Sequence, residues 1–120
     1  MKNVVLLIFL LISNIGLGQN YKQRTTVVQY SASFVKDKEI SLKRFEKDYS
    51  IYVFYMNVDA DKFKKDNIKY VPTIIIYHNE EEYYRLDGGI KLELPENAQQ
   101  KIKGKLEEII ESKFVISTLF

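Results

Sequence analysis

The hydrophobic positions of the chain form short runs of β-branched and aromatic residues, separated by stretches with a helical period. Three such runs, at residues 25–32, 51–58 and 73–76, predict strands, and Pro72 suits the start of the third. Because residues 51–58 are almost continuously apolar, we expect both faces of this strand to be buried.

A hairpin is predicted after the third strand. Asn79 and Glu80 suit its turn, residues 83–86 form the returning strand, and Gly88 and Gly89 end that strand. The third and fourth strands should therefore be antiparallel neighbours.

Helical periodicity marks two longer segments. In residues 36–49, apolar positions recur at i, i+3 and i+7, with charges on the opposite face. A second helix is predicted from Pro95, a residue favoured at the first helical position, to about residue 113. We expect the apolar tail that follows to dock on the domain. The apolar face of this second helix is formed by Ala98, Ile102, Leu106, Ile109, Ile110 and Phe114.

Residues 59–68 predict a short helix or turn, with Asp59 or Asp61 available as its cap. The two aspartates are also spaced like the first ligands of a calcium-binding loop. The glycine and the terminal glutamate of such a loop are missing, so we interpret them as capping residues.

The predicted order is strand, helix, strand, short helix, strand, strand, helix. A crossover helix makes the first two strands parallel, whereas the hairpin adds an antiparallel pair. The sequence therefore predicts an α/β domain, with a mixed central sheet and helices on both faces. The 120 residues allow one such domain.

The N-terminal segment has the pattern of a secretory signal peptide. Lys2 precedes an apolar run at residues 4–12, and the small residues Gly16 and Gly18 follow. We expect residues 1–18 to be removed, leaving a secreted or periplasmic domain at residues 19–120 without membrane contact. The alternative is an uncleaved membrane anchor, although the run is shorter than the ~20 residues of a spanning helix.

Charge and residue types exclude several functions. A formal net charge of +2 gives no electrostatic argument for nucleic acid binding. The chain has no cysteine, which excludes thiol nucleophiles, thiolate metal sites and thiol–disulfide exchange within this chain. His78 is the only histidine, and a catalytic base needs an orienting partner. We therefore expect no enzyme activity of these kinds, no metal site and no cofactor.

Three stretches, spanning most of residues 25–113, resemble the thioredoxin family. The first, VVQYSASFVKDK, is similar to the family strand that leads into the W-C-G-P-C-K motif. The second, FYMNVDADKFKKDNIKYVPTIIIYHN, resembles the family segment with a short helix and a Val-Pro-Thr triplet. The third, EEYYRLDGG, is similar to the hairpin strand that ends at the family's glycine. The resemblance implies a thioredoxin-like fold with a cis bond between Val71 and Pro72.

The residues of the family's redox chemistry are absent. The resemblance places Phe34 at the motif's tryptophan, and Val35 and Lys38 at its two cysteines. The family's buried acidic residue falls on Gln29. The family's N-terminal strand and helix also have no counterpart. The resemblance therefore implies a redox-inactive member of the family.

In redox-active relatives the loop before the first helix faces the cis-proline loop, whose backbone pairs with an extended peptide. The resemblance therefore implies a peptide-binding edge. Its residues would be Phe34, Val35, Lys36, Asp37, Lys38, Tyr70, Val71, Pro72 and Thr73.

The leading hypothesis is an exported adaptor or holdase that binds a protein or peptide. Two alternatives stay open. One is an accessory component of a thiol–disulfide exchange system, with cysteines supplied by a partner protein, and the other is an enzyme of unrelated mechanism that reuses the fold. A further possibility is that the residues of the edge only maintain the fold.

Overall fold

The computed structural model describes residues 20–119, and their side chains from Tyr21 to Ser112. The predicted signal peptide, residues 1–18, lies outside the described residues. The described part of the chain contains two hydrophobic core clusters, whose described residues lie between Tyr21 and Ile109.

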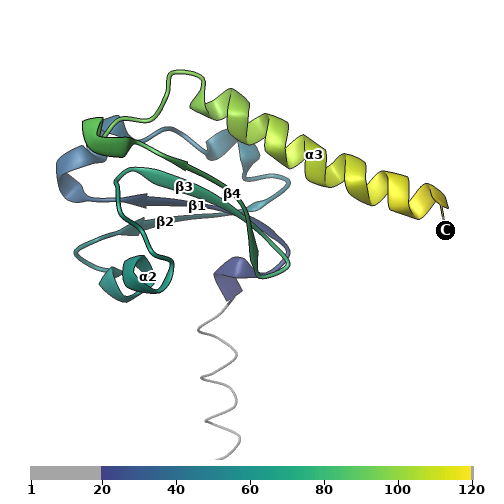
Figure 1. The fold of residues 1–120 in the computed structure, drawn as a ribbon, viewed down its shortest axis with the longest axis horizontal. Coiled ribbons are helices and arrows are strands. Elements are labelled where there is room, and N and C mark those ends of the chain that lie inside the picture. The colour runs from purple at the N-terminus through teal and green to yellow at the C-terminus, as the bar shows by residue number, and fades with distance from the viewer. Residues whose placement is uncertain (1–19, 120) are drawn as a thin grey trace, which may run out of the picture.

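A four-stranded mixed sheet forms the centre of the domain, in the order β2–β1–β3–β4. β1 is parallel to β2 and antiparallel to β3, and β3 is antiparallel to β4 (Figure 1). The predicted mixed sheet is confirmed, and within residues 20–119 no strand precedes β1. The strands are Thr25–Ser31 (β1), Ser50–Tyr55 (β2), Thr73–His78 (β3) and Glu81–Asp87 (β4).

Helices cover both faces of the sheet (Figure 1). The α-helix Ala98–Leu119 (α3) lies over one face, where its residues pack with Val27 of β1. The shorter α-helix Ala60–Lys65 (α2) and the 3₁₀ helix Asn20–Lys22 (η1) lie on the other face, which receives Val28. Successive residues of β1 therefore supply two different cores, as the pleat of a strand requires.

Residues 36–49 do not form the predicted helix. The crossover from β1 to β2 contains two 3₁₀ helices instead, Ser33–Lys38 (η2) and Lys43–Phe45 (η3). The buried Gln29 explains the difference, because its Nε2 donates to the Ile40 carbonyl at 2.9 Å and its Oε1 accepts the Ile40 N–H at 3.1 Å. Both backbone groups of Ile40 are thereby withdrawn from helical hydrogen bonding.

The expectation that the second strand is buried on both faces is wrong. β2 ends at Tyr55, and among the strands of residues 20–119 it has only β1 as a neighbour. Of its six residues Phe54 alone is buried, whereas Val53 is 40% exposed. An apolar run does not reveal how many neighbours its strand has, and here the strand lies at the edge.

Asp59 stands at the N-cap position of α2 but does not cap the helix with its side chain. Its Oδ2 accepts the N–H of Tyr55 at 3.2 Å, and its Oδ1 lies 3.4 Å from the Lys62 ammonium. Asp61 lies in the first turn of α2. The predicted helix is confirmed, and the predicted capping by Asp59 is not.

The hairpin between β3 and β4 is confirmed. Asn79 and Glu80 form its turn with φ values of 51° and 72°, the left-handed region that hairpin turns use. β4 is longer than predicted and ends before Gly88. A short 3₁₀ helix, Gly89–Lys91 (η4), follows, and Gly89 has a φ of 61°.

α3 begins at Ala98, three residues after Pro95, and continues to Leu119. Ala98, Ile102, Leu106 and Ile109 of the predicted apolar face are buried. Ile110 is instead 53% exposed, and the side chains of Phe114 and the tail lie outside the described set. Within residues 20–119, no helix is both long enough and apolar enough to cross a membrane.

Candidate functional site

The strand register brings four loops to one end of the sheet. Ser31 pairs with Tyr55, Tyr30 with Thr73, and Thr73 with Asp87. The loops after β1, β2 and β4 and the loop before β3 consequently lie together (Figure 1). We call this end of the molecule the loop end.

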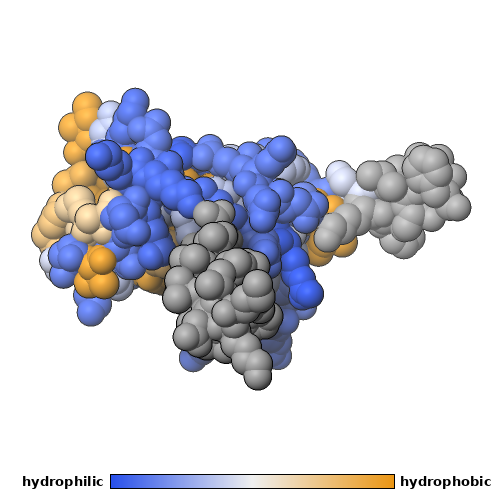
Figure 2. Space-filling model, turned by 90° about the horizontal axis from the view of Figure 1, so that it is seen from below, coloured by the Kyte–Doolittle hydropathy of each residue, from blue (hydrophilic) through white to orange (hydrophobic). Residues whose placement is uncertain are grey.

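Large apolar side chains are exposed at the loop end, and each of the four loops contributes at least one. Figure 2 shows hydrophobic residues gathered at the left of the molecule, where η2 and η4 lie in Figure 1. The most exposed are Phe34 at 62%, Val58 at 74% and Ile90 at 89%. Clustered exposure of this kind marks interaction sites in soluble proteins. We define the apolar patch as Phe34, Met56, Val58, Tyr70 and Ile90.

The structure divides the predicted site residues into exposed and buried groups. The exposed members are Phe34, Lys36, Asp37, Lys38 and Tyr70, and the buried members are Val35, Val71, Pro72 and Thr73. Val35 and Val71 belong to the same core cluster, so both predicted loops rest on a shared base. Only the exposed members and the backbone of the buried ones are accessible to a partner.

The Val71–Pro72 bond is cis, as the sequence predicts. The Thr73 hydroxyl donates to the Tyr70 carbonyl at 2.6 Å, and the Gly88 N–H donates to the Pro72 carbonyl at 3.0 Å. These bonds hold the loop before β3 against the end of β4. Among the backbone hydrogen bonds of residues 20–119, none involves the N–H or the C=O of Val71.

Glu39, the residue that follows η2, is hydrogen-bonded to the ends of β1 and β2. Glu39 accepts hydrogen bonds from the Ser31 hydroxyl at 2.9 Å and from the Tyr55 hydroxyl at 3.0 Å. Burial and the Glu39 carboxylate raise the pKa of Tyr55. These bonds tie Glu39, at the end of η2, to β1 and β2, so the group fixes the position of η2 at the loop end.

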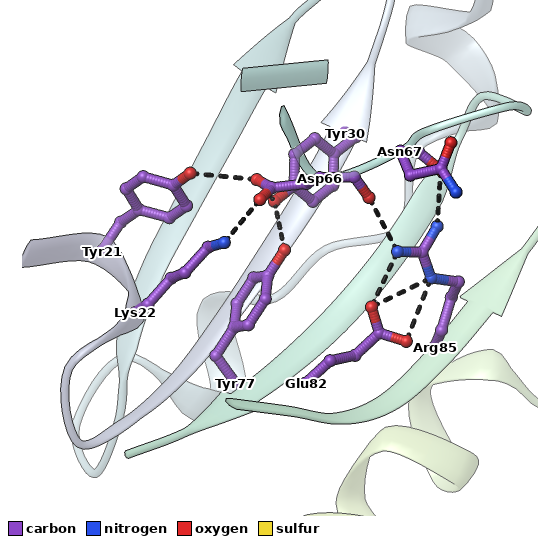
Figure 3. A network of polar contacts seen from close by, with 8 residues as sticks. All are labelled: Tyr21, Lys22, Tyr30, Asp66, Asn67, Tyr77, Glu82 and Arg85. Atoms are coloured by element: carbon purple, nitrogen blue, oxygen red, sulfur yellow. Dashed lines mark hydrogen bonds and ion pairs between the residues drawn. The ribbon is translucent and has the colours of Figure 1, made fainter. Parts of the chain in front are cut away.

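A buried polar network is centred on Asp66, and no sequence pattern predicted it (Figure 3). Asp66 Oδ2 accepts from the hydroxyls of Tyr30 at 2.5 Å and Tyr21 at 3.0 Å. Its Oδ1 lies 2.6 Å from the Lys22 ammonium, in an ion pair without hydrogen-bond geometry, and Tyr30 shares a 2.7 Å bond with Tyr77. Burial opposes the charge on Asp66, but the ion pair with Lys22 and the hydrogen bonds from the tyrosines prevail and lower the pKa of Asp66 below the usual 3.8.

Arg85 of β4 connects this network to the hairpin. Its guanidinium donates to the carbonyls of Asp66 at 2.8 Å and Asn67 at 3.0 Å. It also pairs with Glu82 at 2.7 Å (Figure 3). The chain between α2 and the cis-proline is therefore held at its start by β1, β4 and η1 together.

A pocket of about 630 Å³ opens between α2 and β4 and reaches the predicted site at Tyr70. Its lining includes the buried Asp66 and Tyr77 and the exposed Lys65 and Lys69. Charges of both signs line it, so it suits polar groups rather than a large apolar ligand. Within the described residues, no three His, Asp or Glu side chains converge to hold a metal ion.

Comparisons with known proteins show the fold. A thioredoxin from Trypanosoma brucei brucei aligns with a TM-score of 0.55 at 14% identity, over 83% of this chain and 86% of that one. The crystal structure of a designed protein aligns with a TM-score of 0.57 at 16% identity, over 82% and 86%. No family model and no curated protein matches the sequence. The chain has a thioredoxin-like fold, and at this identity the likeness says nothing about function.

Proposed function

We propose that this chain is an exported, redox-inactive thioredoxin-like domain that binds a protein or peptide at the loop end, as an adaptor or a holdase. The observation that carries the proposal is the apolar patch, which four separate loops bring together beside Val71. A chain without cysteine cannot form a disulfide of its own, so non-covalent binding is the activity that this surface supports.

An extended peptide can bind here by strand addition. The N–H and C=O of Val71 would each bond to the peptide backbone, which fixes its direction and register. A typical hydrogen bond contributes only about 0.5–1.5 kcal/mol net. These two bonds are therefore too weak to hold a partner alone.

The apolar patch supplies the larger contribution. Fully burying one side chain of this size is worth about 1.5–3 kcal/mol, so covering Phe34, Tyr70 and Ile90 outweighs the backbone bonds. Association itself costs at least ~4 kcal/mol, which explains why several side chains must contribute together. The charged Lys36, Asp37 and Lys38 would then form part of a polar rim.

The test captures partners on the chain from Gln19 to Phe120, which contains both core clusters. The bait is exposed to a thiol-blocked extract of the source cell envelope. A Phe34→Ser, Tyr70→Ala double variant is run beside it. Ile110→Ser, which changes an exposed apolar residue of α3, is the matched control.

An adaptor predicts one protein held by the wild type and the control and lost from the double variant. A holdase predicts many unfolded proteins that are captured by the wild type and the control and lost from the double variant. Equal capture on all three baits would contradict binding at the loop end.

A further inference from the structure

β2 is an edge strand that lacks the usual protection against pairing. Its six residues, Ser50–Tyr55, include no charge and no proline, and its register with β1 has no bulge. Edge strands in natural sheets usually carry such features, because an open edge is a template for another strand. The opposite edge, β4, does carry them: a register shift against β3 and the charged residues Glu81, Glu82, Arg85 and Asp87.

Backbone direction shows which groups of β2 face outward. The N–H of Met56 donates to the Ser31 carbonyl at 3.0 Å, so Met56 faces β1. Along a strand, the N–H and C=O of successive residues alternate between the two sides. Ile51 and Val53 therefore direct their N–H and C=O groups away from β1, toward the open edge.

Tyr55 confirms this direction and marks the end of the open edge. Its N–H points to the same side as that of Val53 and bonds to the Asp59 carboxylate, not to a strand. The carboxylate thus covers the edge at Tyr55. The open part consists of the four outward backbone groups of Ile51 and Val53, which have no partner among the described residues.

We propose that this edge pairs antiparallel with β2 of a second copy of the chain, around a two-fold axis at Tyr52. In that register Ile51 of each copy lies opposite Val53 of the other, and the two residues exchange both hydrogen bonds. All four open backbone groups of each copy are then satisfied, and the bond from Tyr55 to Asp59 is left intact.

The side chains of β2 are self-complementary in this register. Opposed residues of an antiparallel pair share one face of the sheet. Ile51 packs in the α3 cluster, so the half-exposed Val53 of the other copy extends that cluster. Tyr52 packs on the α2 face and meets its own counterpart there as an aromatic pair. No like charges are opposed, because the strand has none.

A second copy fits better than an unrelated strand because the same surface supplies both halves of the interface. A two-fold axis makes each contact occur twice, which is the common arrangement of homodimers. The two sheets of four strands would form one continuous sheet. Because the paired strands run in opposite directions, the two loop ends would point away from each other. The inference rests on β2 alone and does not depend on the proposed function.

Sedimentation of the chain from Gln19 to Phe120 over a concentration series tests the pairing. We expect the mass to rise toward twice that of the monomer with concentration. Val53→Lys should keep the protein monomeric, with an unchanged far-ultraviolet circular dichroism spectrum. Val58→Lys, the same change at a more exposed valine outside β2, should dimerise like the wild type. A wild type that stays monomeric, or a Val53→Lys variant that dimerises equally well, would overturn the proposal.

Single cysteines test the register, since the chain has no other thiol. Tyr52→Cys places two thiols opposite each other, at a Cα separation of ~4.5 Å that permits a disulfide. Mild oxidation should therefore link Tyr52→Cys into covalent dimers. Val53→Cys should stay unlinked, because its counterpart lies diagonally across the strands. Absence of linkage through Tyr52→Cys, or equal linkage through Val53→Cys, would overturn this register.

Discussion

The Tyr30 hydroxyl donates a 2.5 Å hydrogen bond to Asp66 Oδ2, joining β1 to the residue that follows α2. Tyr21 and Lys22 reach the same carboxylate from η1. The buried Asp66 carboxylate thus holds together β1, η1 and the segment that follows α2. The segment after α2 continues to Val71. The network positions the proposed binding edge from inside the domain.

Asp66→Asn should destabilise the domain by ~1.5–3 kcal/mol, because a neutral amide replaces the charged acceptor of Tyr21 and Tyr30 and the ion-pair partner of Lys22. Urea unfolding at neutral pH measures this change. Asp61→Asn is the control, since Asp61 is exposed on α2 and should shift the free energy of unfolding by no more than about 0.5 kcal/mol. Equal effects of the two variants would contradict a central role for Asp66.

The pH dependence of stability follows from the lowered pKa of Asp66. The folded protein binds the Asp66 proton less tightly than the unfolded chain, whose carboxyl has a pKa near 3.8. Its stabilisation is therefore complete above pH 3.8 and is lost as the pH falls through the folded pKa. The unfolding free energies of wild type and Asp66→Asn should converge on acidification below pH 3.8. A constant difference would contradict this linkage.

Raising the pH should also destabilise the domain, through the buried tyrosines. Burial is the largest cause that raises the pKa values of Tyr21, Tyr30 and Tyr77 above the ordinary 10.0. Their contribution to stability is complete below pH 10 and is lost as the pH rises further. Near-ultraviolet titration should show these hydroxyls ionising only as the domain unfolds. Tyr30→Phe should remove part of that late step, whereas a single early step for all tyrosines would argue against the network.

Gln29→Leu should destabilise the domain by about 2–4 kcal/mol, because it leaves the N–H and C=O of Ile40 without their partners. Thermal or urea unfolding measures the change. Gln99→Leu removes a hydrogen bond of the same kind to Ser41 at an exposed position and should change stability by at most about 0.5 kcal/mol. Similar values for both variants would mean that Gln29 does not hold the crossover.

Substitutions in the apolar patch should leave the fold and its stability almost unchanged. Phe34→Ser and Ile90→Ser change strongly exposed side chains, so each should alter the free energy of unfolding by no more than about 0.5 kcal/mol. Both should reduce the fluorescence of a dye that binds apolar surfaces. A large loss of stability in either variant would assign these residues to the core.

The sequence predicted those features that local patterns determine. The strands, the Asn79–Glu80 turn and the cis bond at Pro72 follow from residue types and from the family resemblance, and all are present. The prediction of a crossover helix was wrong because hydrogen bonds between Gln29 and Ile40, eleven positions apart, replace helical ones. No periodicity within residues 36–49 reports such a contact.

The site was predicted only in outline. Its two loops lie together, but Val35 and Thr73 point into the protein, while Ile90 belongs to the exposed surface without having been predicted. The register of β1, β3 and β4 places Ile90 there, and register is a property of the whole sheet. Asp66 was missed for the same reason, because its partner Tyr30 lies 36 positions away.

Heteronuclear NMR of the isotopically labelled domain gives the most direct test of peptide binding at the loop end. The probe is an extended peptide selected on the wild type from a random library. We expect saturable shifts of the amides of Val71, Phe34 and Tyr70, with the Val71 amide protected from hydrogen exchange and the amide of Ile110 unchanged. Saturable binding that leaves the Val71 and Phe34 amides unchanged, or a library that yields no binding peptide, would contradict it.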